Sequence, residues 1–310
     1  MIALKKKKHP VAWRIRREMQ WYSFILPTIV CLILFTYIPL INSLRYSLYR
    51  VSVVGFGEEF IGLRNYQALL GSSAFWNAVL NTVILAVFSL ISIPVGFVLA
   101  TQINSLGKTR AQSFFRVSFY LPNMVTGVSV VLLFQFIFLR DGGLINSFLS
   151  IITGREITIG WLTDPSLTKI AATILGLWSG LGYNMLINLA GMQSIPQELY
   201  EAASIDGCNG LKRWLFITIP NMTGTFTFLL ITSVIGSFSR FTDLFLLSGN
   251  SSAGNPSASL QTILMYIYQF SFRTPNFGLS TAGSMVLFVL ILTVTLFNLK
   301  VTGFFKKDTL

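Results

Sequence analysis

Side chains that carry out chemistry are scarce in this chain of 310 residues. Only 11% of the residues are charged, and there are 11 Asp and Glu residues, one His and two Cys. Cys31 lies inside an apolar run and Cys208 in a charged segment, so we expect them at different depths and predict no disulfide. Neither cysteine has metal-ligand spacing, and the only histidine, His9, lies near the N-terminus. These scarcities argue against a metal centre and against most acid–base active sites.

Motifs for catalysis are missing as well. The sequence contains no G-x-S-x-G, no H-E-x-x-H and no paired carboxylates within its apolar runs. A "GKT" triplet at residues 107–109 lacks the first glycine of a phosphate-binding loop, because Gln102 occupies that position. We therefore expect a chain that is not an enzyme and that binds no cofactor or metal of its own.

What the sequence does have is long apolar runs. Hydrophobic residues make up 53% of the chain, which is a membrane composition. A helix that crosses the bilayer needs about 20 largely apolar residues. Six stretches meet this requirement and predict an all-α, polytopic membrane protein with six transmembrane helices. They run approximately from Ser23 to Leu44, Asn77 to Ile103, Val117 to Leu139, Ile170 to Met192, Leu215 to Phe238 with a more polar end up to Phe245, and Ser280 to Leu299.

The distribution of positive charge orients these spans. If both termini are cytoplasmic, fifteen of the 23 Lys and Arg residues fall on the cytoplasmic side, as the positive-inside rule favours. The formal net charge of +12 is then a consequence of membrane topology. No basic patch interleaved with stacking aromatics supports a nucleic-acid partner. We predict a basic cytoplasmic segment at 1–21, which is too charged for a cleaved signal peptide, a membrane domain at 22–305 and a cytoplasmic tail at 306–310.

Ionisable side chains are nearly absent from the middle of the predicted spans. Ion-coupled carriers keep such groups on their pathway, because a moving charge needs a site. An ion-coupled secondary carrier is therefore a disfavoured alternative, and it is further weakened by the lack of an evident internal repeat. A non-transporting membrane scaffold is the second alternative.

One charged segment interrupts the apolar half of the chain. Residues 193–213 form the predicted cytoplasmic loop between spans four and five. Ser194 and Gln197 have the spacing of a capping box, and Pro196 suits a first helical turn, so we predict a helix from Ser194 to Asp206. Gly207 is placed to end this helix in a left-handed conformation.

This predicted loop helix needs a partner. It has one small apolar face, made by Leu199, Ala202 and Ala203, and a helix of about 12 residues is marginal alone in water. The same spacing of apolar residues would also occur in an amphipathic helix that has no partner. The wider sequence pattern, however, favours docking of this helix on a partner.

The same segment resembles the "EAA" signature of bacterial ABC importer permeases. In that family the loop is a coupling helix that sits in a cleft of the ATPase subunit. The only departure is Ile219, where Leu is usual. The resemblance implies an ATPase-coupling role for Glu201, Ala202, Ala203, Asp206, Gly207, Ile217 and Pro220.

Other stretches are similar to the sugar-uptake branch of the family, the maltose-permease-like membrane subunits. They are "FIGLRNYQALLGSSAFWNAVLNT" (Phe60 to Thr82), "FFRVSFYLPNMVTGVSVVLLFQFIF" (Phe114 to Phe138), "GWLTDP" (Gly160 to Pro165) and "NLKVTGFFKK" (Asn298 to Lys307). The resemblance implies a multi-pass protein of the bacterial cytoplasmic membrane that pairs with a second permease, two ATPase subunits and an extracytoplasmic solute-binding protein. ATP and Mg would be bound by the ATPases, and a sugar would cross by alternating access.

A sugar path needs hydrogen-bonding groups and aromatic faces. Span four offers Trp178, Ser179, Tyr183 and Asn184, and Ser233, Ser237 and Arg240 recur at i, i+4 and i+7 as on one helical face. The corresponding segments of maltose permeases contribute to the sugar site. Small and hydroxyl residues also mediate helix packing in membranes, so both roles are open. The predicted substrate-binding residues are Gly180, Tyr183, Asn184, Ser233, Ser237 and Arg240.

Two departures from the maltose-permease pattern suggest a different or larger ligand. Gly176 and Gly236 replace larger sugar-contacting residues, and Arg240 introduces a charge. An Arg near a span needs a partner or a wet cavity, and Asp243, three residues later, is a candidate partner.

Overall fold

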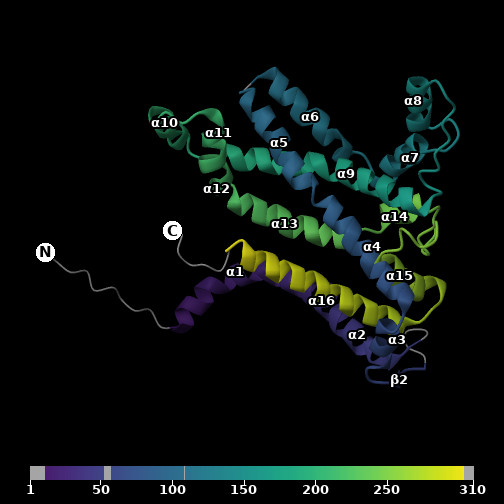
Figure 1. Cartoon of the computed structure of the whole chain (residues 1–310). Coiled ribbons are helices and arrows are strands. Elements are labelled where there is room, and N and C mark those ends of the chain that lie inside the picture. Colours follow the sequence, from purple (N-terminus) through teal and green to yellow (C-terminus); the bar gives the residue numbers. More distant parts are fainter. Residues whose placement is uncertain (1–10, 52–56, 108, 304–310) are drawn as a thin grey trace.

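The chain folds into long helices that run roughly alongside one another (Figure 1). The computed structural model describes residues 11–51, 57–107 and 109–303, with side chains from residue 22 onward. The predicted tail at 306–310 lies outside the described residues. Of the predicted segment at 1–21, only the backbone from Val11 is described, and it is helical.

Four helical segments are long and apolar enough to cross a membrane. They agree with the predicted first, second, fourth and sixth spans. The first is continuous over α1 (Val11–Leu32), the π-helical η1 (Ile33–Tyr37) and α2 (Ile38–Ser47). The others are α4 (Ser73–Ser89) with α5 (Ser92–Ser105), α9 (Pro165–Gln193) and α16 (Phe277–Val301).

The predicted third and fifth spans are bent. The third consists of α6 (Arg110–Met124) and α7 (Gly127–Ile137), which meet at 96° where Val125 and Thr126 are extended. The fifth consists of α11 (Gly210–Arg213), the π-helical η2 (Trp214–Thr218), α12 (Ile219–Asn221) and α13 (Thr223–Phe238), with a bend of 61° before α13. With each bent pair counted as one span, the described residues contain six spans.

The predicted polar extension of span five up to Phe245 is wrong as a continuous helix. Helix α13 ends at Phe238, and a separate short helix, α14 (Thr242–Leu247), follows. Phe241 lies between them with φ −138° and ψ −62°, outside the helical region, so it separates the two axes.

Short elements occupy the loops. A two-stranded antiparallel hairpin pairs β1 (Tyr49–Arg50) with β2 (Glu59–Phe60), and an Arg50–Glu59 ion pair of 2.9 Å supports its register. The remaining helices are α3 (Arg64–Leu70), α8 (Leu144–Thr153), α10 (Gln197–Ile205), α15 (Ile263–Tyr268) and the π-helical η3 (Gln269–Arg273).

Helices α5 and α9 pack along each other at the centre of the bundle. Gly96 on α5 allows this approach, because a Cβ there would lie 2.9 Å from the backbone nitrogen of Met185. Gly182 plays the same part between α9 and α6, where an added Cβ would collide with the carbonyl of Phe119. Small residues of this kind let membrane helices come close.

A long loop folds back against α4 instead of extending outward. The side-chain nitrogen of Asn81, a fully buried residue, donates to the carbonyls of Ala258 and Gln261 at 2.8 and 3.1 Å. The hydroxyl of Thr82, also buried, accepts a hydrogen bond of 2.9 Å from the amide of Ile263. Two buried polar side chains of α4 therefore bond to a segment far along the chain, while Asn81 Oδ1 has no partner among the described residues.

The two ends of the bundle differ. The start of α1, the end of α16 and the segment α10–α12 lie at one end, whereas the hairpin, α3, α8 and α15 lie at the other (Figure 1). The loop helix α10, which is predicted to dock on a partner, thus lies at the same end of the bundle as the start of α1 and the end of α16.

Candidate functional site: a polar pocket and an exposed loop helix

A pocket of about 640 Å³ lies among α6, α7, α9 and α13, beside the break between α4 and α5. We call it the central pocket. All six residues predicted to bind substrate are among those that line it: Gly180, Tyr183, Asn184, Ser233, Ser237 and Arg240. Gly176 and Gly236 line it too, whereas Trp178 is not among its lining residues and has its ring 5.3 Å from that of Phe134.

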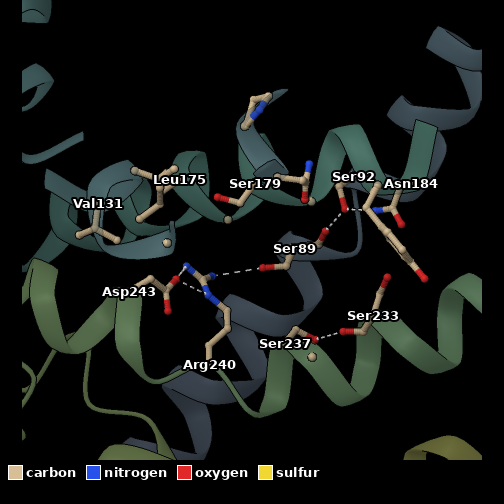
Figure 2. A pocket seen from close by; sticks show the side chains of 18 of the residues that line it. Ser89, Ser92, Val131, Leu175, Ser179, Asn184, Ser233, Ser237, Arg240 and Asp243 are labelled. Atoms are coloured by element: carbon tan, nitrogen blue, oxygen red, sulfur yellow. Dashed lines mark hydrogen bonds and ion pairs between the residues drawn. The ribbon is translucent and has the colours of Figure 1, made fainter. Parts of the chain in front are cut away.

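Hydroxyls and amides from separate helices meet in this pocket (Figure 2). Asn184 donates through its side-chain nitrogen to the Ser92 hydroxyl at 2.7 Å, and that hydroxyl donates to the carbonyl of Ser89 at 2.6 Å. The other amide atom, Asn184 Oδ1, is buried and accepts no hydrogen bond from any described residue. Buried polar atoms are rarely unpaired, so this oxygen is an unsatisfied acceptor beside the pocket.

Ser89 and Ser92 were missed by the sequence prediction. They lie on either side of the break between α4 and α5, which Leu90 and Ile91 form. The local signal was Pro94, since a proline in the first turn of a helix marks a new helical start. Thr232 and Asp243 also line the pocket and were not predicted to bind substrate.

An ion pair occupies one side of the pocket. Arg240 donates from Nε and Nη2 to Oδ2 of Asp243, at 2.8 and 2.5 Å. Arg240 Nη2 also donates to the carbonyl of Ala172 at 2.9 Å, and Nη1 lies 3.3 Å from the Ser89 hydroxyl. Asp243 as the partner of Arg240 is therefore confirmed. The charge that Arg240 introduces is therefore compensated by Asp243.

Gly176 now has a local explanation. A Cβ at this position would lie 2.7 Å from Nη1 and 3.0 Å from Cζ of Arg240. The guanidinium thus occupies the space that a larger residue would take. By contrast, nothing lies within 4 Å of a Cβ placed on Gly236, so that glycine widens the pocket itself.

The remaining predicted residues differ in what they offer. The Ser237 hydroxyl donates to the carbonyl of Ser233 at 2.6 Å, and Ser237 is buried, so only its acceptor capacity is left. A Cβ on Gly180 would lie 3.1 Å from the Ser92 hydroxyl, which gives Gly180 a packing role. The predicted shared helical face is wrong for Arg240, which lies beyond the end of α13.

The loop helix differs from its prediction at one end. Helix α10 begins at Gln197 with no side-chain cap, and the Ser194 hydroxyl donates instead to the carbonyl of Gly191 at 2.7 Å. The predicted capping box is wrong because α9 continues to Gln193 and takes Ser194 as its own end. Gly207 behaves as predicted, with φ +75°, and Cys208 N–H bonds the carbonyl of Ala203 at 2.9 Å.

The outer surface of α10 is partly apolar. Of the predicted apolar face, Ala203 is buried against the protein, whereas Leu199 and Ala202 are exposed. Ile205 is 87% exposed, and Glu201 and Asp206 are exposed beside it. The exposed side of α10 thus carries apolar side chains next to acidic ones.

Two side-chain contacts tie this loop to the membrane helices. Trp214 donates from its indole nitrogen to the Thr101 hydroxyl of α5 at 3.1 Å, and its ring stacks on Phe97 at 5.3 Å. The hydroxyls of Tyr200 and Thr218 are 3.0 Å apart. Ile217 packs in the same cluster, and Pro220 is exposed in the first turn of α12. Tyr200 of α10 thus contacts η2, and η2 contacts α5, which begins at the central pocket.

Sequence comparison identifies the family. The profile of the binding-protein-dependent transport system inner membrane component matches residues 92–305, which include the loop and every pocket-lining residue except Ser89. The chain belongs to this family. It is thus a multi-pass inner-membrane transport component.

Individual relatives of this transport component cover nearly its whole length. It is 34% identical over 277 residues to the lactose transport system permease protein LacF of Rhizobium radiobacter, with 88% of this chain and 91% of LacF covered. It is 30% identical over 286 residues to the probable ABC transporter permease protein YurN of Bacillus subtilis, with 92% and 95% covered.

A solved structure has the same fold. One chain of a bacterial ABC transporter that imports the acidic polysaccharide alginate superposes with a TM-score of 0.80, at 24% identity, with 97% of this transport component and 100% of that chain covered. The bent spans and the helical loop elements therefore belong to a known architecture.

Proposed function

We propose that the chain is a membrane-spanning permease subunit of an ATP-binding-cassette importer for a saccharide. The observation that carries this proposal is the central pocket, where hydroxyl and amide groups from five helices, α4, α5, α6, α9 and α13, surround a cavity inside an apolar bundle. Sugars present hydroxyl groups and apolar faces, and pockets of 300–1,000 Å³ with a few placed polar groups are typical of small-molecule sites. Relatives named for lactose and for arabinooligosaccharides agree with this ligand class.

The energy source in this proposal is external to the chain. Two ATPase subunits bind ATP and Mg, and one of them docks on α10, with Glu201 and Ala202 in the contact and Ile205 in an apolar recess. A carboxylate such as that of Glu201 suits an Arg or backbone donors of a partner. The start of α1 and the end of α16 are then on the cytoplasmic side, because α10 lies at their end of the bundle. A second permease completes the pathway, and an extracytoplasmic binding protein delivers the sugar.

Transport in proteoliposomes tests the proposal. The purified complex with its binding protein should accumulate a labelled saccharide only when hydrolysable ATP is present on the ATPase side. Accumulation driven by an ion gradient without ATP would establish the secondary-carrier alternative. Failure of any ATPase to co-purify with the chain would favour a scaffold.

Two variants separate the pocket from the loop. Tyr183→Phe keeps the ring and removes a hydroxyl at the pocket, so it should change the affinity for the sugar and leave the ratio of sugar moved to ATP hydrolysed unchanged. Glu201→Trp places a bulky group on the exposed face of α10, so it should lower that ratio and leave sugar affinity unchanged. Identical effects of both variants would contradict the division of roles.

A further inference from the structure

The charge balance of the central pocket rests on one pair. Among the described residues that line the pocket, Arg240 and Asp243 are the only ones of the Arg, Lys, Asp and Glu types. Their side chains are 11% and 27% exposed. The pocket therefore holds one positive and one negative charge, with a net charge of zero.

This pair is held in place by the bundle. The carbonyl of Ala172 on α9 accepts from Nη2 of Arg240, and Gly176, one turn further along α9, leaves the space that the guanidinium fills. An added side chain at Gly176 would displace the guanidinium. The position of Arg240 is thus fixed by two residues of another helix and by Asp243.

Each partner keeps some hydrogen-bonding capacity. Both hydrogen bonds from Arg240 end on Oδ2 of Asp243, so Oδ1 accepts none from the described residues. Nη1 of Arg240 has only the 3.3 Å contact with Ser89. A hydroxyl group can donate to a carboxylate oxygen and accept from a guanidinium, whereas a ligand carboxylate can only accept and would be repelled by Asp243.

We infer that Asp243 is a specificity-determining residue, which neutralises Arg240 and restricts the central pocket to uncharged saccharides. The inference rests on the proposed function and narrows its substrate class. The relatives leave that class open, since their names include lactose, sn-glycerol-3-phosphate and, for the solved structure, acidic alginate. Rejection of a charged ligand follows because it would lose hydration without meeting a compensating net charge.

Sugars that differ only in charge test the inference. The probes are methyl glucoside, methyl glucuronide and methyl glucosaminide, which are neutral, anionic and cationic. Binding to the purified importer complex in nanodiscs, without the binding protein, is measured by saturation-transfer NMR. The wild-type complex should bind the glucoside at least about tenfold more tightly than either charged sugar. In a variant that leaves one of the two charges unpaired, a ligand charge of opposite sign about 6 Å away, at an effective dielectric constant of about 20, corresponds to a gain of roughly 100-fold in affinity, and screening reduces this.

Three variants change the net charge in a matched way. Asp243→Asn leaves an unbalanced Arg240 and should tighten glucuronide binding about tenfold or more. Arg240→Gln leaves an unbalanced Asp243 and should do the same for the glucosaminide. The double variant restores neutrality and should gain neither. Because the two single variants test opposite charges, loss of folding in one still leaves the other informative, and the wild-type preference needs no variant.

The outcomes distinguish the inference from the proposed function. If the complex imports a saccharide with ATP but the wild type binds charged and neutral sugars equally, or binds none of the three, the inference is wrong and the proposed function stands. The same holds if the folded single variants gain no charged sugar, or if the double variant gains one. If no saccharide is imported with ATP, the proposed function itself fails.

Discussion

Replacement of Gly207 gives a quantitative test of the loop helix. This glycine has φ +75°, and nothing lies within 4 Å of a Cβ built on it. Alanine at this position would therefore meet no steric obstacle from the rest of the protein. Its cost comes only from the left-handed backbone conformation, which is about 1–2 kcal/mol for a residue with a Cβ. A free energy of about 1.4 kcal/mol corresponds to a factor of ten in an equilibrium constant. Gly207→Ala should therefore lower the equilibrium constant for forming the native end of α10 by roughly 5-fold to 30-fold.

The binding of the isolated ATPase to the permease in nanodiscs measures this effect. If native α10 is the docking element, the Kd should rise by at most this factor, with the full rise reached only when the native end is the minor form, and less sugar should be moved per ATP. Gly207→Asn should cost less than Gly207→Ala, because Asn tolerates the left-handed region better. Gly210→Ala is the matched control, since Gly210 begins α11, is equally open and has no positive φ. Equal Kd values for Gly207→Ala and Gly210→Ala would refute the reasoning.

Three further predictions concern the bundle. Trp214→Phe keeps the aromatic stack on α5 but removes the indole donor to Thr101, so it should lower the amount of sugar moved per ATP with little change in sugar affinity. Thr101→Val removes the acceptor of the same hydrogen bond. A different phenotype for Thr101→Val would contradict a role for this hydrogen bond. Gly236→Leu should fill open space in the central pocket and raise the KM for uptake severalfold while basal ATP hydrolysis is kept; unchanged uptake would show that the pocket does not carry the sugar. Gly182→Ala should force α6 away from α9 at a cost of about 1–3 kcal/mol, visible as a lower unfolding temperature in detergent, and an unchanged temperature would count against close packing there.

Prediction from the sequence was most successful where a long run of apolar residues decides the structure. The span at α9 and the one at α16 follow from apolar length alone, because a spanning helix satisfies its own backbone. The bends were not predictable in this way. The break after Met124 is set by two extended residues, and hydropathy does not distinguish a straight span from two helices at 96°.

Local sequence patterns gave a wrong prediction where one residue could belong to either of two helices. Ser194 has the spacing of an N-cap for α10, yet it closes the last turn of α9, because α9 is long and packed and α10 is short. The pocket was partly predictable for a related reason. Ser233 and Ser237 share a helical face that periodicity reveals, whereas Ser89 and Ser92 reach the pocket only through the packing of α4 and α5 against α9.

The contacts between α4 and the loop near residue 260 have a consequence for synthesis. Asn81 and Thr82 find their partners 177–181 residues later in the chain. At about 5–20 residues per second, a ribosome needs roughly 10–35 seconds to supply them. During that time the Asn81 amide lacks these carbonyls, and the Thr82 hydroxyl, which donates to the carbonyl of Ala78 within α4, lacks the backbone amide of Ile263. The contacts that close α4 against the rest of the bundle are therefore among the last that the growing chain can make.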